Sequence, residues 1–251
     1  MAFIFIGGLT FLLVLFAFIH LAKDSMHWFV KIIWTLFFAA YTLFWALFLL
    51  EYSDGHEYWR KIDTSTFYSP LSSRNSLTFW VYQVFSIIGV IKLWSRGRQQ
   101  APLLVVIFAI FVLSGLFFNL ALIVQLSTCW DGISGSHQTG LLLGPISHVV
   151  ISLLVLLNLI KREAEEANTR SFQHAVLQLL NEKIKASQHL GPWIVILFLP
   201  FFMLTTLVLI LFGQEFDSFT KVFTETTTWH FSQKTHPPYM DHQGHYLCTV
   251  A

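Results

Sequence analysis

The sequence predicts an all-α fold, a polytopic bundle of about six transmembrane helices with one amphipathic helix at the membrane surface. The 251 residues are 55% hydrophobic and only 12% charged, whereas soluble domains carry about twice that share of charge. Six apolar stretches each approach the roughly 20 residues that a helix needs to cross a bilayer. They are Ala2–Leu21, Trp28–Leu50, Leu77–Trp94, Pro102–Leu126, Leu141–Ile160 and Trp193–Phe212.

Basic residues are distributed unevenly among the loops that join these stretches. Ten of the fifteen Lys and Arg residues belong to the first, third and fifth loops, and nine of the fourteen acidic residues belong to the other side. Cytoplasmic loops of membrane proteins carry the excess of Lys and Arg, so the odd-numbered loops are expected to face the cytoplasm. We therefore expect a multi-pass protein of the cell (inner or plasma) membrane with both termini outside.

The segment 161–192 is too polar to cross the membrane. Its apolar residues recur at helical spacing and indicate an amphipathic helix that lies in the inner interface or packs on the bundle. A docking site for a cytoplasmic partner is the alternative. We assign this segment to a bundle domain of residues 1–212, followed by an extramembrane tail of residues 213–251. The apolar positions are Phe172, Val176, Leu179, Leu180 and Ile184.

His148 is the ionisable residue that lies well inside a predicted span. It follows Gly144 and Pro145, and the proline removes a backbone hydrogen bond and can kink the helix. A neutral imidazole bonded to a neighbouring helix is one interpretation, and a proton relay or a metal or haem ligand is the other. Haem is disfavoured because no second histidine lies at a matching depth. Polar partners for His148 on the third and fourth spans are Tyr82, Gln83, Ser86, Ser114 and Asn119.

The tail holds the densest set of metal-ligand types in the chain. His242, His245 and Cys248 could supply nitrogen and sulfur to a metal, although their spacing matches no zinc signature. Cys129 and Cys248 are the two cysteines of the chain, and both face outward in the predicted topology. In an oxidising exterior they could form a disulfide, which we favour over a metal site. We assign no catalytic or cofactor-binding residue and no cofactor.

The tail also carries a resemblance. The sequences FTETTTWHFSQ and GHYLCTVA are similar to those of an uncharacterised family of bacterial multi-pass membrane proteins, in which a hydrophobic helix bundle precedes such a tail. Members of that family continue past the second motif into a basic region, so the resemblance implies a short or truncated member. The family has no assigned activity, and the resemblance implies no role for His245, Tyr246 or Cys248.

Three classes of function remain open. We favour a structural or accessory membrane protein, a subunit or partner of a larger assembly in the lipid bilayer, with no nucleic-acid partner and no enzymatic activity. A small-solute or ion transporter using His148 is the first alternative, and it should show charges or broken helices near the bilayer midplane. The second is a membrane enzyme with a metal or thiol site in the tail, which needs convergent acids, bases or ligands.

Overall fold

The computed structural model describes residues 2–21, 28–54, 70–96, 100–128, 135–167, 171, 173–179, 182 and 190–234. These residues form helices and turns with no β-strand, which confirms the predicted all-α class. The elements are α1 (Ala2–Leu21), α2 (Trp28–Asp54), the 3-10 helix η1 (Ser73–Asn75), α3 (Ser76–Arg96), α4 (Pro102–Thr128), α5 (Gly135–Ala167), α7 (Leu190–Leu211) and α8 (Ser218–Lys234).

Five helices of the described chain are long and apolar enough to cross a membrane, so the protein is an integral membrane protein. The sixth expected crossing is α1, a helix of 20 residues without a charged side chain. Half of its side chains are outside the described part of the chain, and its crossing stays a prediction. The five spans are Trp28–Leu50, Ser73–Trp94, Leu103–Ser127, Gly140–Ile160 and Gly191–Leu211.

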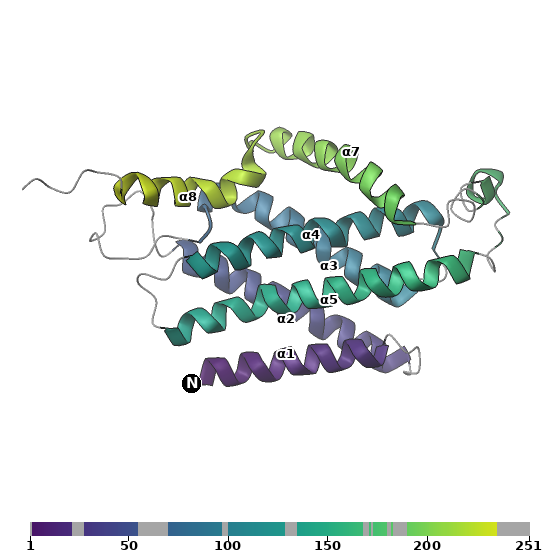
Figure 1. The fold of residues 1–251 in the computed structure, drawn as a ribbon, viewed down its shortest axis with the longest axis horizontal. Coiled ribbons are helices and arrows are strands. Elements are labelled where there is room, and N and C mark those ends of the chain that lie inside the picture. The colour runs from purple at the N-terminus through teal and green to yellow at the C-terminus, as the bar shows by residue number, and fades with distance from the viewer. Residues whose placement is uncertain are drawn as a thin grey trace, which may run out of the picture.

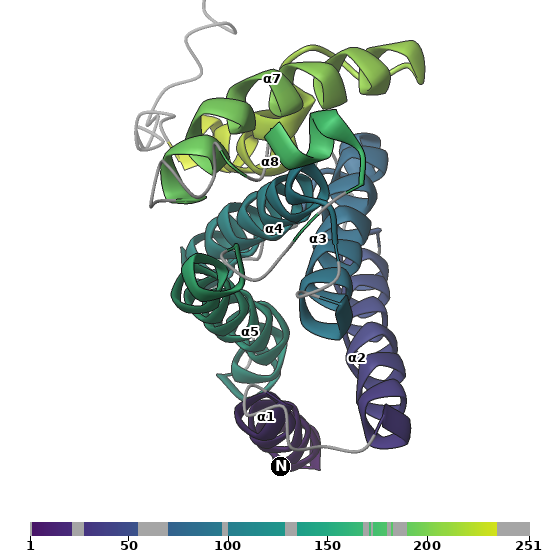
Figure 2. The same cartoon turned by 90° about the vertical axis from the view of Figure 1, so that its right-hand side faces the viewer.

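The helix α4 occupies the centre of the bundle and packs on α3, α5, α7 and α8. Seen end on, α1, α5 and α4 form one row, α2 and α3 form a second row, and α7 crosses above them with α8 (Figure 2). The start of α1 and the end of α8 lie at the same end of the molecule (Figure 1), which we call the tail end. The expectation that both termini face the exterior stays a prediction.

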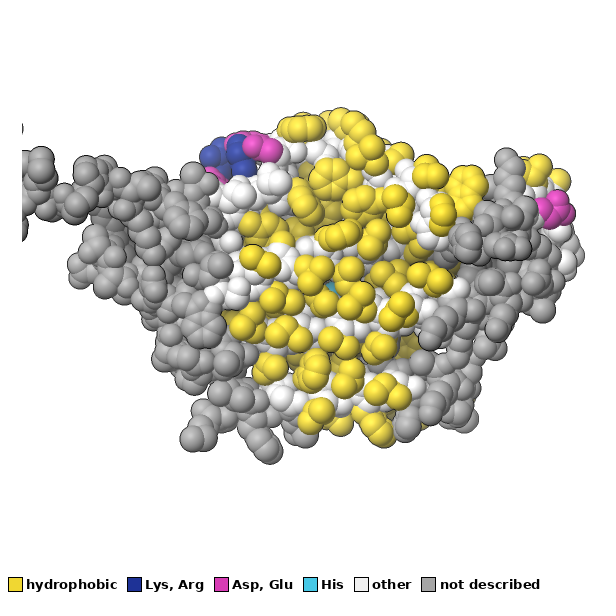
Figure 3. Space-filling model, in the orientation of Figure 1, with side chains coloured by type: hydrophobic (Ala, Val, Ile, Leu, Met, Phe, Trp, Pro, Cys, Tyr) yellow, Lys and Arg dark blue, Asp and Glu magenta, His cyan; other side chains and the backbone are white. Residues whose placement is uncertain are grey.

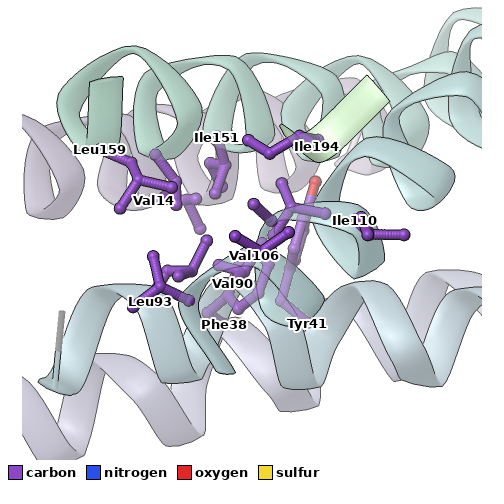
Figure 4. Packing of buried hydrophobic residues seen from close by; sticks show 14 of the residues in the cluster. Val14, Phe38, Tyr41, Val90, Leu93, Val106, Ile110, Ile151, Leu159 and Ile194 are labelled. Carbon is purple, nitrogen blue, oxygen red and sulfur yellow. The ribbon is translucent and has the colours of Figure 1, made fainter. Parts of the chain in front are cut away.

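The core consists of side chains from α1 and from each of the five spans. Lipid chains are as apolar as leucine, so close packing and interhelical hydrogen bonds, rather than escape from water, hold such helices together. One cluster of buried residues fills the interior (Figure 4), and a second lies towards the tail end. Residues of the first cluster include Val14, Phe38, Val90, Val106, Ile151 and Ile194.

Two glycines allow α3 and α4 to approach closely. A Cβ atom on Gly89 of α3 would lie 2.7 Å from the carbonyl oxygen of Phe108 on α4, and a Cβ atom on Gly115 of α4 would overlap the side chain of Ser86 on α3. Ser86 and Gly89 are three residues apart and share one face of α3. Small residues are typical of tightly packed membrane helices because they let the backbones meet.

The expected amphipathic segment is described only in part. The helix α5 continues past Ile160 to Ala167, and residues 175–179 form a further helical turn. Val176 and Leu179 are 71% and 53% exposed, so these two apolar side chains do not pack on the bundle. Phe172 and Ile184 lie outside the described residues, and a continuous amphipathic helix stays a prediction.

We expect Gly115→Ala to destabilise the protein, because the new methyl group forces α3 and α4 apart. Overpacking of this kind costs about 1–3 kcal/mol, more than alanine gains over glycine in helix propensity. The measurement is the thermal unfolding midpoint in detergent. Gly8→Ala is the control, since a Cβ atom at Gly8 would meet nothing within 4 Å. If the midpoint of Gly115→Ala equalled or exceeded that of the wild type, the close packing of α3 and α4 would be contradicted.

Candidate functional site

His148 lies near the middle of its span and connects three helices. Its side chain is 2% exposed, and its Nε2 atom is 2.6 Å from Ser86 Oγ on α3. The ring stacks on Phe38 of α2, with 5.8 Å between the ring centroids. Ser86 is therefore the side chain, among the partners considered from the sequence, that hydrogen-bonds to this imidazole.

The second ring nitrogen of His148 has no such partner. Within the described residues, His148 Nδ1 and Ser152 Oγ are both buried and make no hydrogen bond. The two residues are four positions apart on α5, so they occupy the same face of the helix. Two unpaired polar atoms thus lie one helical turn apart beside the α3–α5 contact.

Asn119 and Gln83 form a second interhelical bond instead of reaching His148. Asn119 Nδ2 donates to Gln83 Oε1 at 3.2 Å and to the Gly115 carbonyl oxygen at 2.8 Å. Ser114, another candidate partner, donates to a carbonyl oxygen of its own helix. Buried polar side chains therefore link α4 to α3 and α3 to α5. We call this set, Gln83, Ser86, Asn119 and His148, the polar seam.

A third bond joins α5 to α2. Ser147 Oγ and the Tyr41 hydroxyl are 3.1 Å apart, and both side chains are buried. One turn earlier, a Cβ atom on Gly144 would lie 2.8 Å from the ring of Trp45, so the glycine allows α2 to pack closely. Ser147 and Ser152 were not among the candidate residues predicted from the sequence. The pattern that could have indicated them is the helical spacing of small polar residues around His148.

The helix α8 is attached to the bundle by a cluster that sequence reasoning missed. Ser72 Oγ donates to Glu225 Oε2 at 2.5 Å, and Asn75 Nδ2 donates to the same carboxylate oxygen at 3.1 Å. The backbone amide of Ser72 also donates to the carbonyl oxygen of Val222 at 2.9 Å. We call Ser72, Asn75 and Glu225 the tail-end clamp. A carboxylate that accepts two hydrogen bonds is well suited to fix one helix against another.

Aromatic packing supports the clamp from within. Phe219 lies against Tyr82 with 5.0 Å between ring centroids, and Phe223 lies against Phe118 with 4.9 Å. Val222, between them on α8, is fully buried. The chain reaches this position through a turn at Gly213, whose φ of 85° is readily adopted by glycine. The first part of the expected tail is thus a helix packed on the bundle.

Charged side chains surround the turn between α7 and α8. Arg74 pairs with Glu215 at 3.1 Å, and Lys221 pairs with Glu215 and with Asp217. Hydrogen bonds to Glu215 and Asp217 raise the pKa of the Lys221 ammonium above its usual value. Figure 3 shows blue and magenta side chains together beside a broad apolar face. Exposed ion pairs of this kind add little stability.

The tail ligands and the cysteines are not part of this site. His242, His245, Cys248 and Cys129 lie outside the described residues. Over the described ranges, no three His, Cys, Asp or Glu side chains are grouped in a way that could hold a metal ion. The metal site and the disulfide therefore stay predictions.

Comparison with known proteins gives one match. The family model described as the DUF6688 N-terminal domain matches residues 1–240. This chain belongs to that family. DUF6688 is an uncharacterised family, as the resemblance implied, and the match ends before the motif at residues 244–251. A bacterial source and the tail motif remain predictions for this DUF6688 member. No curated protein and no solved structure matches the chain.

We expect His148→Ala to reduce both the folded yield and the thermal midpoint, because it removes the Ser86 bond and the ring that packs on Phe38. Interhelical hydrogen bonds in membranes contribute about 0.6 kcal/mol and up to roughly 1.7 kcal/mol, and the lost ring volume adds to this. His174→Ala, at an exposed histidine, is the control. If His148→Ala had the same folded yield and midpoint as the wild type, His148 would not hold the helices together.

A second prediction concerns the tail-end clamp. Glu225→Ala leaves Ser72 and Asn75 without their shared acceptor, and losing a bond to a charged group costs about 1–3 kcal/mol. Amide hydrogen exchange in α8 should accelerate by roughly 5- to 100-fold. Thr224→Ala is the control, since that hydroxyl is exposed and bonds within α8. Unchanged exchange in Glu225→Ala would contradict the clamp.

Proposed function

We propose that this protein is an accessory integral membrane protein that acts as a subunit or partner of a larger membrane assembly. The proposal rests on the observation that buried polar side chains of the bundle form hydrogen bonds between its own helices. Ser86 bonds to His148, Asn119 bonds to Gln83, and Ser147 bonds to Tyr41, each between two helices. These groups hold the bundle together, so what the spans offer to other molecules is mainly apolar surface.

Among the five described spans, α7 is the most exposed. Only 22% of its span is buried, against 56% for the spans of α4 and α5. It crosses obliquely above the bundle (Figure 2) and packs chiefly on α4. We infer that another membrane protein contacts this side, with lipid covering the remaining spans. The outward apolar residues, which we call the α7 face, are Val195, Leu199, Met203, Leu204, Leu207 and Leu211.

The proposal includes a sidedness. The excess of Lys and Arg in the odd-numbered loops favours a cytoplasmic position for the ends of the helices opposite α8. The start of α1 and the end of α8 share the other end (Figure 1). We therefore propose a cell-membrane location with the tail end outside, where the tail-end clamp meets the exterior.

A transporter that uses His148 is the second candidate. The unpaired Nδ1 atom of this buried histidine is the observation that favours it. A transport path, however, needs polar groups that line an opening, whereas Gln83, Ser86 and Asn119 bond to neighbouring helices. The enzyme alternative depends on His242, His245 and Cys248, and no contact among the described residues supports it.

The test is purification from native membranes in mild detergent with quantitative mass spectrometry of what co-purifies. Leu204→Trp and Leu207→Trp enlarge the α7 face, and we expect each to reduce recovery of a specific partner at least about 10-fold, which corresponds to roughly 1.4 kcal/mol. Leu36→Trp and Leu47→Trp are matched controls on α2, where the leucines are equally exposed, and they should leave recovery unchanged.

One result would contradict the accessory role, and another would contradict the contact at the α7 face. The wild-type chain could purify alone, which would favour the transporter. Alternatively, the tryptophan variants on α2 and α7 could reduce recovery equally, which would mean that the α7 face makes no particular contact.

A further inference from the structure

Two of the five buried side-chain polar atoms that make no hydrogen bond in the described chain lie one helical turn apart on α5. They are His148 Nδ1 and Ser152 Oγ, whose side chains are 2% and 0% exposed. An unpaired polar group in such a place is costly, and buried polar groups nearly always bond to protein or to an ordered water. We propose that His148 and Ser152 form a binding site for a single buried water molecule. This site is independent of the accessory role.

The geometry of α5 brings the two groups to one place. Residues four apart lie on the same face of a helix, and the side chain of a helical residue leans back over the preceding turn. Ser152 therefore leans towards His148. The Nε2 contact with Ser86 and the stacking on Phe38 hold the imidazole ring in one orientation. Nδ1 is thus fixed on the side of the ring that is turned away from Ser86.

The chemistry of the pair favours water over other ligands. If Nε2 carries the proton and donates to Ser86 Oγ, then Nδ1 needs a donor. If Ser86 donates to Nε2, then Nδ1 carries the proton and needs an acceptor. Water meets either need, because it donates and accepts, and it bonds to the Ser152 hydroxyl in both cases. The ligand is therefore defined by hydrogen bonding and not by charge.

A metal ion fits this place poorly. Zinc takes four ligands, and here one nitrogen and one hydroxyl are available. In the described part of the chain no acidic side chain and no cysteine joins His148 in a metal-binding group. The ring stacks on a phenylalanine and hydrogen-bonds to a serine, and neither side chain carries a negative charge that would balance a cation.

The first experiment compares Ser152→Ala with wild type by thermal unfolding in detergent. If a water is bound, removing the hydroxyl leaves it under-bonded, and the midpoint should fall by roughly 2–4 °C. If the hydroxyl has no ligand, its removal relieves an unpaired group, and the midpoint should stay or rise. Ser114→Ala is the matched control, because Ser114 is equally buried and bonds only within its own helix.

The second arm tests whether the two residues share the ligand. In a His148→Phe background the water has lost one partner, so Ser152→Ala should no longer lower the midpoint. The same fall in both backgrounds would overturn the proposal. If His148→Phe does not fold, the folded Ser152→Ala variant still decides. Its His148 Nδ1 nitrogen chemical shift should move away from the wild-type value, whereas the Nε2 shift should not. An unchanged Nδ1 shift would overturn the shared site.

Discussion

The rest of the structure depends on the close approach of α3 and α4. Gly89 on one helix and Gly115 on the other leave no room for a Cβ atom, so the two backbones meet where other residue types would keep them apart. This contact sets the distance at which Asn119 reaches Gln83. It also fixes the face of α3 that carries Ser86, and with it the bond to His148 on α5. Close packing of α3 on α4 therefore determines how α5 is attached to these two helices.

Apolar packing alone does not fix the rotation of each helix in this bundle, and interhelical hydrogen bonds supply that constraint. An apolar helix surrounded by lipid can rotate at little cost, because lipid and leucine offer similar contacts. The polar seam fixes the rotation of α3, α4 and α5 at mid-membrane, and the tail-end clamp fixes α8 where the spans end. The helix α7 is the least buried of the five described spans. Its position is the one that a neighbouring protein could most readily influence.

Much of the fold could be predicted from the sequence because crossing a bilayer imposes a length and a polarity. The expected stretch Trp28–Leu50 is also a span of the structure, and four others differ by a few residues at their ends, whereas the crossing of Ala2–Leu21 stays a prediction. His148 stood out because an ionisable residue within a span is unusual. Ser152 did not, since serines are common in membrane helices and only the neighbouring ring makes its hydroxyl informative. The docking of α8 was also missed. Its apolar residues Phe219, Val222 and Phe223 form a short stripe in a polar sequence, and its partners lie about 100 to 150 residues away.

The most direct measurement compares the cost of Ser86→Ala in two backgrounds by unfolding in detergent. In the wild type, losing the bond to His148 should cost about 0.6–1.7 kcal/mol. In Gly89→Ala, the added methyl group separates α3 from α4 at the Phe108 carbonyl, so Ser86 should already be out of reach of His148 and its replacement should cost little. Equal costs in the two backgrounds would show that the helix contact does not position the polar seam.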